Sequence, residues 1–121
     1  MISRGAESVE PGVQSFVQRI CGRLNVSAVI LFGSRARGDW LESSDVDLLV
    51  VSADWEGVPH LTRLERLFAE WAQASRLGAD LIGLTPEEYR RRAQELSIVG
   101  EIAREGIVVY AVPDWVRPVP R

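Results

Sequence analysis

The chain has 121 residues, a formal net charge of −3 and 46% hydrophobic residues, which predicts one globular domain. The acidic balance argues against a dedicated nucleic-acid-binding protein, and no apolar run approaches the ~20 residues of a membrane-spanning helix. The first residues lack the apolar core of a signal peptide, and the single cysteine, Cys21, allows no internal disulfide, so we expect a cytoplasmic protein.

The first half of the chain predicts a helix and two strands. Residues 1–10 are expected to form an arm. Apolar residues at spacings of three and four then indicate an amphipathic helix that ends near Asn25; they are Val13, Phe16, Val17, Ile20 and Leu24. Residues 26–32 form an apolar strand, 34–37 a helical turn, 38–43 a polar loop and 45–52 a second strand.

The second half predicts two helices and two strands. Thr62-Arg63-Leu64-Glu65 has the form of a capping box, although the helix could also begin a few residues earlier. Gly78 would end this helix, and residues 79–84 are expected to form a third strand. Thr85-Pro86-Glu87-Glu88 is a strong helix start, and this helix is expected to continue to near Gly106. The apolar stripes of these helices are Leu61, Leu64, Leu67, Phe68 and Trp71, and then Tyr89, Ala93, Leu96, Val99 and Ile102.

A fourth strand is expected over residues 107–112. The chain is therefore predicted to be an α/β (α+β) domain over residues 11–112, with a small mixed sheet of about four strands and helices packed on it. Prolines at 113, 118 and 120 indicate an irregular C-terminal tail over residues 113–121.

One motif joins the first two strands. Gly33-Ser34 follows the first strand, ten residues intervene, and Asp45-Val46-Asp47 opens the second strand. Because successive strand residues face opposite sides, Asp45 and Asp47 point the same way. Two such carboxylates beside a tight turn suit a divalent metal ion and phosphate oxygens.

The stretch from Phe32 to Val51, and especially GSRARG followed by SDVDLLVV, resembles the catalytic signature of the DNA polymerase β-like nucleotidyltransferases. It is most similar to the minimal nucleotidyltransferases, small proteins of which many are antitoxins paired with HEPN-domain toxins. The resemblance implies a nucleotidyltransferase fold, ATP as the nucleoside triphosphate and two Mg²⁺ ions. Mn²⁺ suits the same ligands.

The resemblance also implies catalytic and metal-binding roles for three carboxylates. Asp45 and Asp47 would bind both ions, with Asp47 bridging them. Family members usually supply a third carboxylate from a neighbouring strand. Asp80 is the candidate for this third position, and it would complete the site that activates the acceptor.

The nucleotide's phosphates would lie at the Gly-Ser turn. Gly33 permits a sharp turn and close approach, and Ser34 offers a hydroxyl and an amide at the start of a helical turn. All 14 basic residues are arginine. Arg35 or Arg37 can donate forked hydrogen bonds to phosphate, and which of the two faces the site is open. Ser44 is expected to orient the start of the second strand.

Structural explanations compete with these roles. Asp45 could be a turn residue, Asp80 could simply begin its strand, and Arg35 and Arg37 could be solvated. With one histidine, His60, and one cysteine, Cys21, zinc chemistry and a Cys-His nucleophile have little support. His60 is expected to be structural or solvated and Cys21 to be a small core residue. Trp40 is expected to pack on the sheet edge, with stacking on a base as the less favoured alternative. The run Arg90-Arg91-Arg92 is expected to be solvated, with a partner or RNA surface as the less favoured alternative.

Three functions remain open. The first is transfer of AMP from ATP onto a hydroxyl, by resemblance a tyrosine of a HEPN-type toxin. The second is a non-catalytic antitoxin that neutralises its partner by contact, and the third is transfer to a small molecule, as in aminoglycoside nucleotidyltransferases. No membrane partner is expected, and a homo-oligomer is possible.

Overall fold

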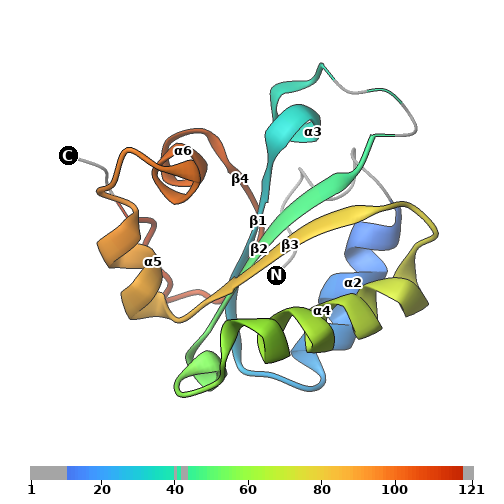
Figure 1. Cartoon of the computed structure of the whole chain (residues 1–121), viewed down its shortest axis with the longest axis horizontal. Helices are drawn as coiled ribbons and strands as arrows, with labels where there is room; N and C mark the ends of the chain where they lie inside the picture. The colour runs from blue at the N-terminus through green and yellow to red at the C-terminus, as the bar shows by residue number, and fades with distance from the viewer. Residues whose placement is uncertain (1–10, 40, 42–43, 119–121) are drawn as a thin grey trace.

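The computed structural model describes residues 11–39, 41 and 44–118. A four-stranded sheet separates two helical layers (Figure 1). The elements in chain order are α2 (Pro11–Cys21), β1 (Val26–Phe32), α3 (Gly33–Arg37), β2 (Val46–Ser52), η1 (Ala53–Trp55), α4 (His60–Ala74), β3 (Ala79–Leu84), α5 (Pro86–Arg92), α6 (Ile98–Glu105) and β4 (Ile107–Ala111).

The sheet has the strand order β3-β2-β1-β4. Strand β1 pairs antiparallel with both β2 and β4, whereas β2 and β3 pair in parallel. A parallel pair needs a crossover connection, and α4 supplies it. The prediction of a mixed α/β domain with about four strands is confirmed.

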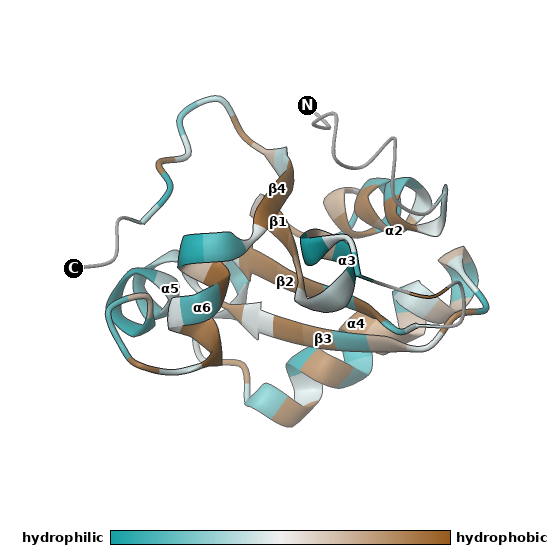
Figure 2. Ribbon diagram, turned by 90° about the horizontal axis from the view of Figure 1, so that it is seen from above, coloured by the Kyte–Doolittle hydropathy of each residue, from teal (hydrophilic) through white to brown (hydrophobic). Residues whose placement is uncertain are grey.

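The alternation of side chains along the strands divides the core between the two faces of the sheet. Val29 and Leu31 of β1 pack with α2 and α4, whereas Ile30 and Phe32 pack with α5 and α6. In Figure 2 the central strands are mostly brown, whereas the helices on both sides alternate between brown and teal. Because both faces are covered, β1 and β2 are nearly continuous apolar runs, and a polar residue in them stands out.

The boundaries of the first two long helices differ from the predicted ones. Helix α2 ends at Cys21, before the predicted Asn25. Helix α4 begins at His60 with Pro59 as its N-cap residue, so Thr62 is not a cap. Leu61 and Phe68, which were expected in the apolar stripe, are exposed. The face of α4 that packs on the sheet is therefore narrower than predicted, and Leu67 and Trp71 are buried on it.

The long helix predicted from Thr85 to Gly106 is wrong, because the chain forms two helices there. The predicted start is confirmed: Thr85 and Glu88 form a reciprocal capping box and Pro86 is in the first turn. A second cap then interrupts the helix, because the Ser97 side chain accepts a hydrogen bond from the Gly100 backbone N–H. Leu96 lies in the break and is 100% exposed, so it does not belong to an apolar stripe.

Smaller differences affect the strand ends. Asp45 precedes β2 rather than opening it, and Val112 follows β4. Within the described residues, no helix is long and apolar enough to cross a membrane. The predicted arm over residues 1–10 lies outside the described residues, as do Trp40 and the last three residues of the tail.

Candidate active site

Three aspartates lie at one end of the strands, where β1 ends and β2 and β3 begin. They are Asp45, Asp47 and Asp80. Asp47 and Asp80 are direct register partners across the parallel pair. Strand alternation places Asp47 on the same face as Leu49, and Asp80 on the same face as Leu84. This is the face covered by α5 and α6, so both carboxylates lie on the α6 side of the sheet.

Two glycines leave room for the carboxylates of the motif. A Cβ at Gly33 would collide with the carboxylate of Asp47, and a Cβ at Gly78 would collide with that of Asp45. Gly33 also has a φ of 73°, which favours glycine. The backbone N–H of Val46 donates to the Gly78 carbonyl at 3.0 Å, which fixes the start of β2 beside β3. The Asp47 carboxylate therefore lies against the turn at Gly33, and the Asp45 carboxylate lies against the turn at Gly78.

The three carboxylates interact electrostatically. Burial raises the pKa of Asp47 above its ordinary value, and the neighbouring charges of Asp80 and Asp45 raise it further. Arg37 and Arg35 lower the same pKa, but less. Asp47 thus holds a negative charge at a place that disfavours it, and a bound cation would relieve both costs.

The structure separates the roles of the two arginines of the motif. Arg35 is 4% exposed, and its guanidinium donates to the Ser44 carbonyl at 2.8 and 3.3 Å. This contact ties α3 to the loop before β2. Arg37 is exposed, lines the pocket beside Asp47 and forms an ion pair with Asp39 at 3.3 Å. Arg37 is therefore the better placed of the two for phosphate.

The two serines of the motif make local contacts. The Ser44 hydroxyl accepts a hydrogen bond from the Leu41 backbone N–H at 3.0 Å. Ser44 is thus held through its hydroxyl by Leu41 and through its carbonyl by Arg35. Ser34 lies in the first turn of α3, whose N-cap residue, Phe32, makes no side-chain capping hydrogen bond. The first amides of a helix have no acceptor within the helix itself and can bind an anion.

A pocket of about 220 Å³ adjoins the carboxylates, between α3 and α6. One wall comes from the predicted motif, and the opposite wall comes from α6. The sequence motif did not point to the α6 residues, because the pattern over residues 85–106 predicts one continuous helix and assigns no role to its acidic residues. The lining residues from α6 are Ile98, Glu101, Ile102 and Glu105.

The donor set fits magnesium. Within residues 11–39, 41 and 44–118, no three acidic, histidine or cysteine side chains group tightly enough to form a complete metal centre. Mg²⁺ is usually held by one or two carboxylates together with substrate phosphates and water. Asp47 and its register partner Asp80, with Asp45 beside them, can supply these carboxylates when a nucleotide supplies the other oxygens.

The remaining candidates lie away from this edge. Arg90 and Arg91 are exposed on α5, and Arg92 pairs with Glu95 at 3.4 Å. His60 is exposed at the start of α4. Cys21 is partly buried at the end of α2 and packs against the core.

Comparisons with known proteins agree with this geometry. A protein of Methanocaldococcus jannaschii inferred to be a protein adenylyltransferase is 41% identical over 44 residues, which are 35% of this chain and 44% of that protein. The chain thus matches less than half the length of this curated relative.

Two solved structures share the fold. An inferred nucleotidyltransferase of Sulfolobus solfataricus has a TM-score of 0.58 at 21% identity, over 93% of this chain and 92% of that one. A toxin–antitoxin complex with AMP-PNP has a TM-score of 0.57 at 21% identity, over 84% of this chain and 73% of that one. The sequence profile of the nucleotidyltransferase domain matches residues 13–109. The chain therefore belongs to the nucleotidyltransferase domain family.

Proposed function

We propose that this protein transfers a nucleoside monophosphate, AMP from ATP, onto an acceptor hydroxyl. The observation that carries the proposal is the placement of Asp47 and Asp80 as register partners beside the Gly33 turn and a pocket. The family supports a nucleoside triphosphate as donor. The relative inferred to be a protein adenylyltransferase supports a protein as acceptor.

In this reaction an acceptor oxygen attacks the α-phosphorus of ATP. The new bond is between that oxygen and phosphorus, and the bond to the oxygen bridging the α- and β-phosphates breaks. Pyrophosphate leaves with the electron pair, and the acceptor's proton passes to a carboxylate, for which Asp80 is our candidate, or to water. Mg²⁺ bound to Asp45, Asp47 and Asp80 would neutralise the charge that develops on the attacking and leaving oxygens.

The chain's own residues position the donor. Gly33 and the first amides of α3 would face the β- and γ-phosphates, and Arg37 would bind them from the pocket side. Arg35 and Ser44 would act indirectly, because their hydrogen bond holds α3 against the start of β2. The phosphates would thus lie on the α3 side of the pocket, opposite the wall that α6 forms.

The toxin–antitoxin neighbour and the resemblance of the motif to antitoxins support a toxin as partner. We propose a HEPN-type toxin as acceptor, modified on a tyrosine. A separate protein would then bring the acceptor hydroxyl to the site.

The test is label transfer from ATP. The purified protein is incubated with Mg²⁺ and α-³²P-ATP in an extract of its host, with parallel reactions containing γ-³²P-ATP. Label from the α-position alone, on a protein band that is lost with Asp47→Asn, supports the proposal. Asp114→Asn is the matched control, because Asp114 is exposed and lies outside the pocket. Equal transfer by the Asp47→Asn variant would refute this mechanism.

A further inference from the structure

The α6 wall of the catalytic pocket is negatively charged, whereas a surface that binds nucleotide phosphates is usually positive. Ile98, Glu101, Ile102 and Glu105 all line the pocket. They are spaced at i, i+3, i+4 and i+7, so they form one face of α6. This face presents two carboxylates and two isoleucines to the space beside Asp47 and Asp80.

The two glutamates are not explained by the stability of the fold. Glu101 and Glu105 are four residues apart on one helix, where like charges repel. Glu105 is also the last residue of α6, at the end where the helix dipole disfavours negative charge. Neither carboxylate forms an ion pair within the described residues. Local rules broken without compensation are expected at functional sites.

These carboxylates do not suit direct contact with the phosphates of the donor nucleotide. ATP carries several negative charges, and Glu101 and Glu105, which are not part of the proposed Mg²⁺ site, would repel it. The phosphates have a favourable place on the opposite wall, at Gly33 and Arg37. A function for the α6 carboxylates must therefore lie with the other substrate, the acceptor.

The pocket is also too small to enclose both substrates. Its volume is about 220 Å³, below the roughly 300 Å³ at which pockets for drug-sized ligands begin. Beside it the surface becomes apolar, because Ile98 is 50% exposed and Leu96, in the break before α6, is 100% exposed. An acceptor would thus insert its reacting group and rest the remainder of its surface on the start of α6.

We infer that the α6 face of the pocket is the docking site of a positively charged protein segment, which carries the acceptor hydroxyl next to basic side chains. Glu101 and Glu105 pair with those basic groups, and Leu96 and Ile98 contact the apolar part of the segment. This inference rests on the proposed function, since it identifies the chemistry of its second substrate.

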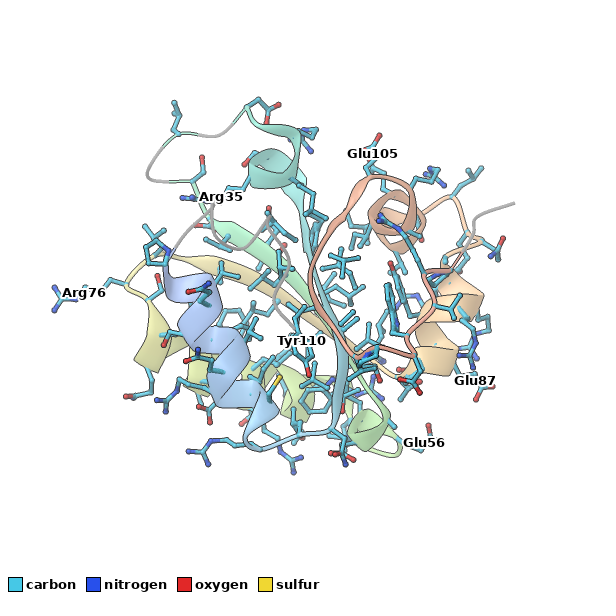
Figure 3. The ribbon with its side chains drawn as sticks, turned by 180° about the vertical axis from the view of Figure 1, so that it is seen from behind. Arg35, Glu56, Arg76, Glu87, Glu105 and Tyr110 are labelled. Atoms are coloured by element: carbon cyan, nitrogen blue, oxygen red, sulfur yellow. The ribbon has the colours of Figure 1, made fainter. Side chains whose placement is uncertain are left out.

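The control for this inference uses charges elsewhere on the molecule. Figure 3 shows Glu105 at the end of the molecule where α3 lies, with Glu56 and Glu87 near the opposite end. The double variant Glu101→Gln/Glu105→Gln removes two charges from the pocket. The double variant Glu56→Gln/Glu87→Gln removes the same number of charges far from it, so any effect of net charge alone is shared by both variants.

The experiment begins with binding, measured without nucleotide. Two fluorescein-labelled tyrosine peptides of equal length are used, one with arginines and one with glutamates beside the tyrosine. We expect the wild type to prefer the arginine peptide, and added NaCl to reduce the preference. The pocket variant should lose about three- to tenfold in affinity for that peptide, since each exposed charge pair contributes modestly. The control variant should bind as the wild type does.

The second measurement is transfer of label from ATP to the same peptides. The pocket variant should raise the KM for the arginine peptide and leave the KM for ATP unchanged. A raised KM for ATP with unchanged peptide binding would overturn the inference and assign α6 to the nucleobase. Preferred modification of kanamycin, a small polycation, would also overturn it.

The inference and the proposed function fail separately. If no acceptor in the host extract takes label from ATP, the proposed function fails, whatever the peptides show. If a host protein is labelled equally by the wild type and the pocket variant, with equal KM for that protein, only the docking inference fails.

Discussion

The carboxylate of Asp47 occupies the space that a side chain at Gly33 would need. A Cβ built at Gly33 would overlap this carboxylate, and the φ of 73° is strained for any other residue. Gly33 and Asp47, which have 13 residues between them in the chain, are therefore in contact only because Gly33 has no side chain. This contact explains why the turn and the carboxylate belong to one site.

Substitution Gly33→Ala should reduce both stability and transfer. The positive φ costs about 1–3 kcal/mol in the free energy of unfolding, and the added methyl would displace the Asp47 carboxylate from its position. Gly57→Ala is the control, because Gly57 has a φ of 74° but nothing lies within 4 Å of its added Cβ. Chemical denaturation and the label-transfer assay should show a stability loss for both variants and an activity loss for Gly33→Ala alone. Undiminished transfer by Gly33→Ala would contradict the proposed geometry.

Substitution Asp47→Asn should abolish transfer and raise stability in the absence of divalent metal. Burial and the charges of Asp80 and Asp45 hold the pKa of Asp47 above its ordinary value in the fold, so its charge opposes folding. The penalty grows as pH rises through the ordinary carboxyl range and is absent at lower pH, where the group is protonated in both states. Thermal denaturation in EDTA should give a higher Tm for Asp47→Asn at pH 7 than for the wild type, and a smaller difference at pH 3. A Tm gain at pH 3 as large as that at pH 7 would argue against this cause.

The two arginines of the motif should have separable effects. Arg35→Met removes the hydrogen bonds to the Ser44 carbonyl and leaves that carbonyl unsatisfied, which should cost about 1–3 kcal/mol of unfolding free energy. Arg37→Met should change stability little, because Arg37 is exposed, but it should raise the KM for ATP. Denaturation curves and initial rates over a range of ATP concentrations measure both effects. If Arg37→Met leaves the KM unchanged, Arg37 is a solvated charge.

The core and the motif were predictable because each depends on local patterns. The apolar run over 26–32 and the alternation around Asp47 predicted two strands, and the family resemblance placed them in one sheet. The position of Asp80 near Asp47 was expected from the resemblance and from the place of Asp80 in the third predicted strand. Its direct register with Asp47 depends on the crossover through α4, which no local pattern specifies.

The second wall of the pocket could not be predicted, because it depends on where one helix stops. Continuous helical periodicity between Tyr89 and Ile102 concealed the break, in which Ser97 caps α6 and Leu96 is exposed. The break lets α6 begin in a new direction, and Glu101 then lines the same pocket as Asp47. Ser97, followed three residues later by Gly100, was the available signal, and a serine N-cap without an acidic partner is weak.

A buried ion pair connects the crossover helix to the start of α5. Arg63 donates to Glu88 at 2.7 Å and to the carbonyls of Val58, Gly83 and Trp55 at 2.8, 3.0 and 2.9 Å. Arg63 is 4% exposed, so its charge and donors are fully used. Since Arg63 of α4 thus binds partners in η1, the loop after η1, β3 and α5, these contacts fix the end of the sheet opposite the aspartates.

This pair should make stability depend on pH in the acid range. Hydrogen bonding to Arg63 lowers the pKa of Glu88 from 4.5 to about 2, against the effect of burial. A depressed carboxyl pKa stabilises the fold fully above the unfolded value and progressively less below it. About 3 kcal/mol of unfolding free energy should therefore be lost between pH 4.5 and pH 2.

Glu88→Gln tests this prediction, because it removes the titrating group and keeps the size of the side chain. The variant should be less stable than the wild type at pH 7, since Arg63 would be left buried without its counter-charge. The difference should shrink as pH falls through 4 toward 2. Glu87→Gln serves as the control, because Glu87 is exposed on the same turn and forms no ion pair within the described residues. Urea denaturation at intervals of pH measures the curves, and parallel curves for Glu88→Gln and the wild type would show that Glu88 is not the group responsible.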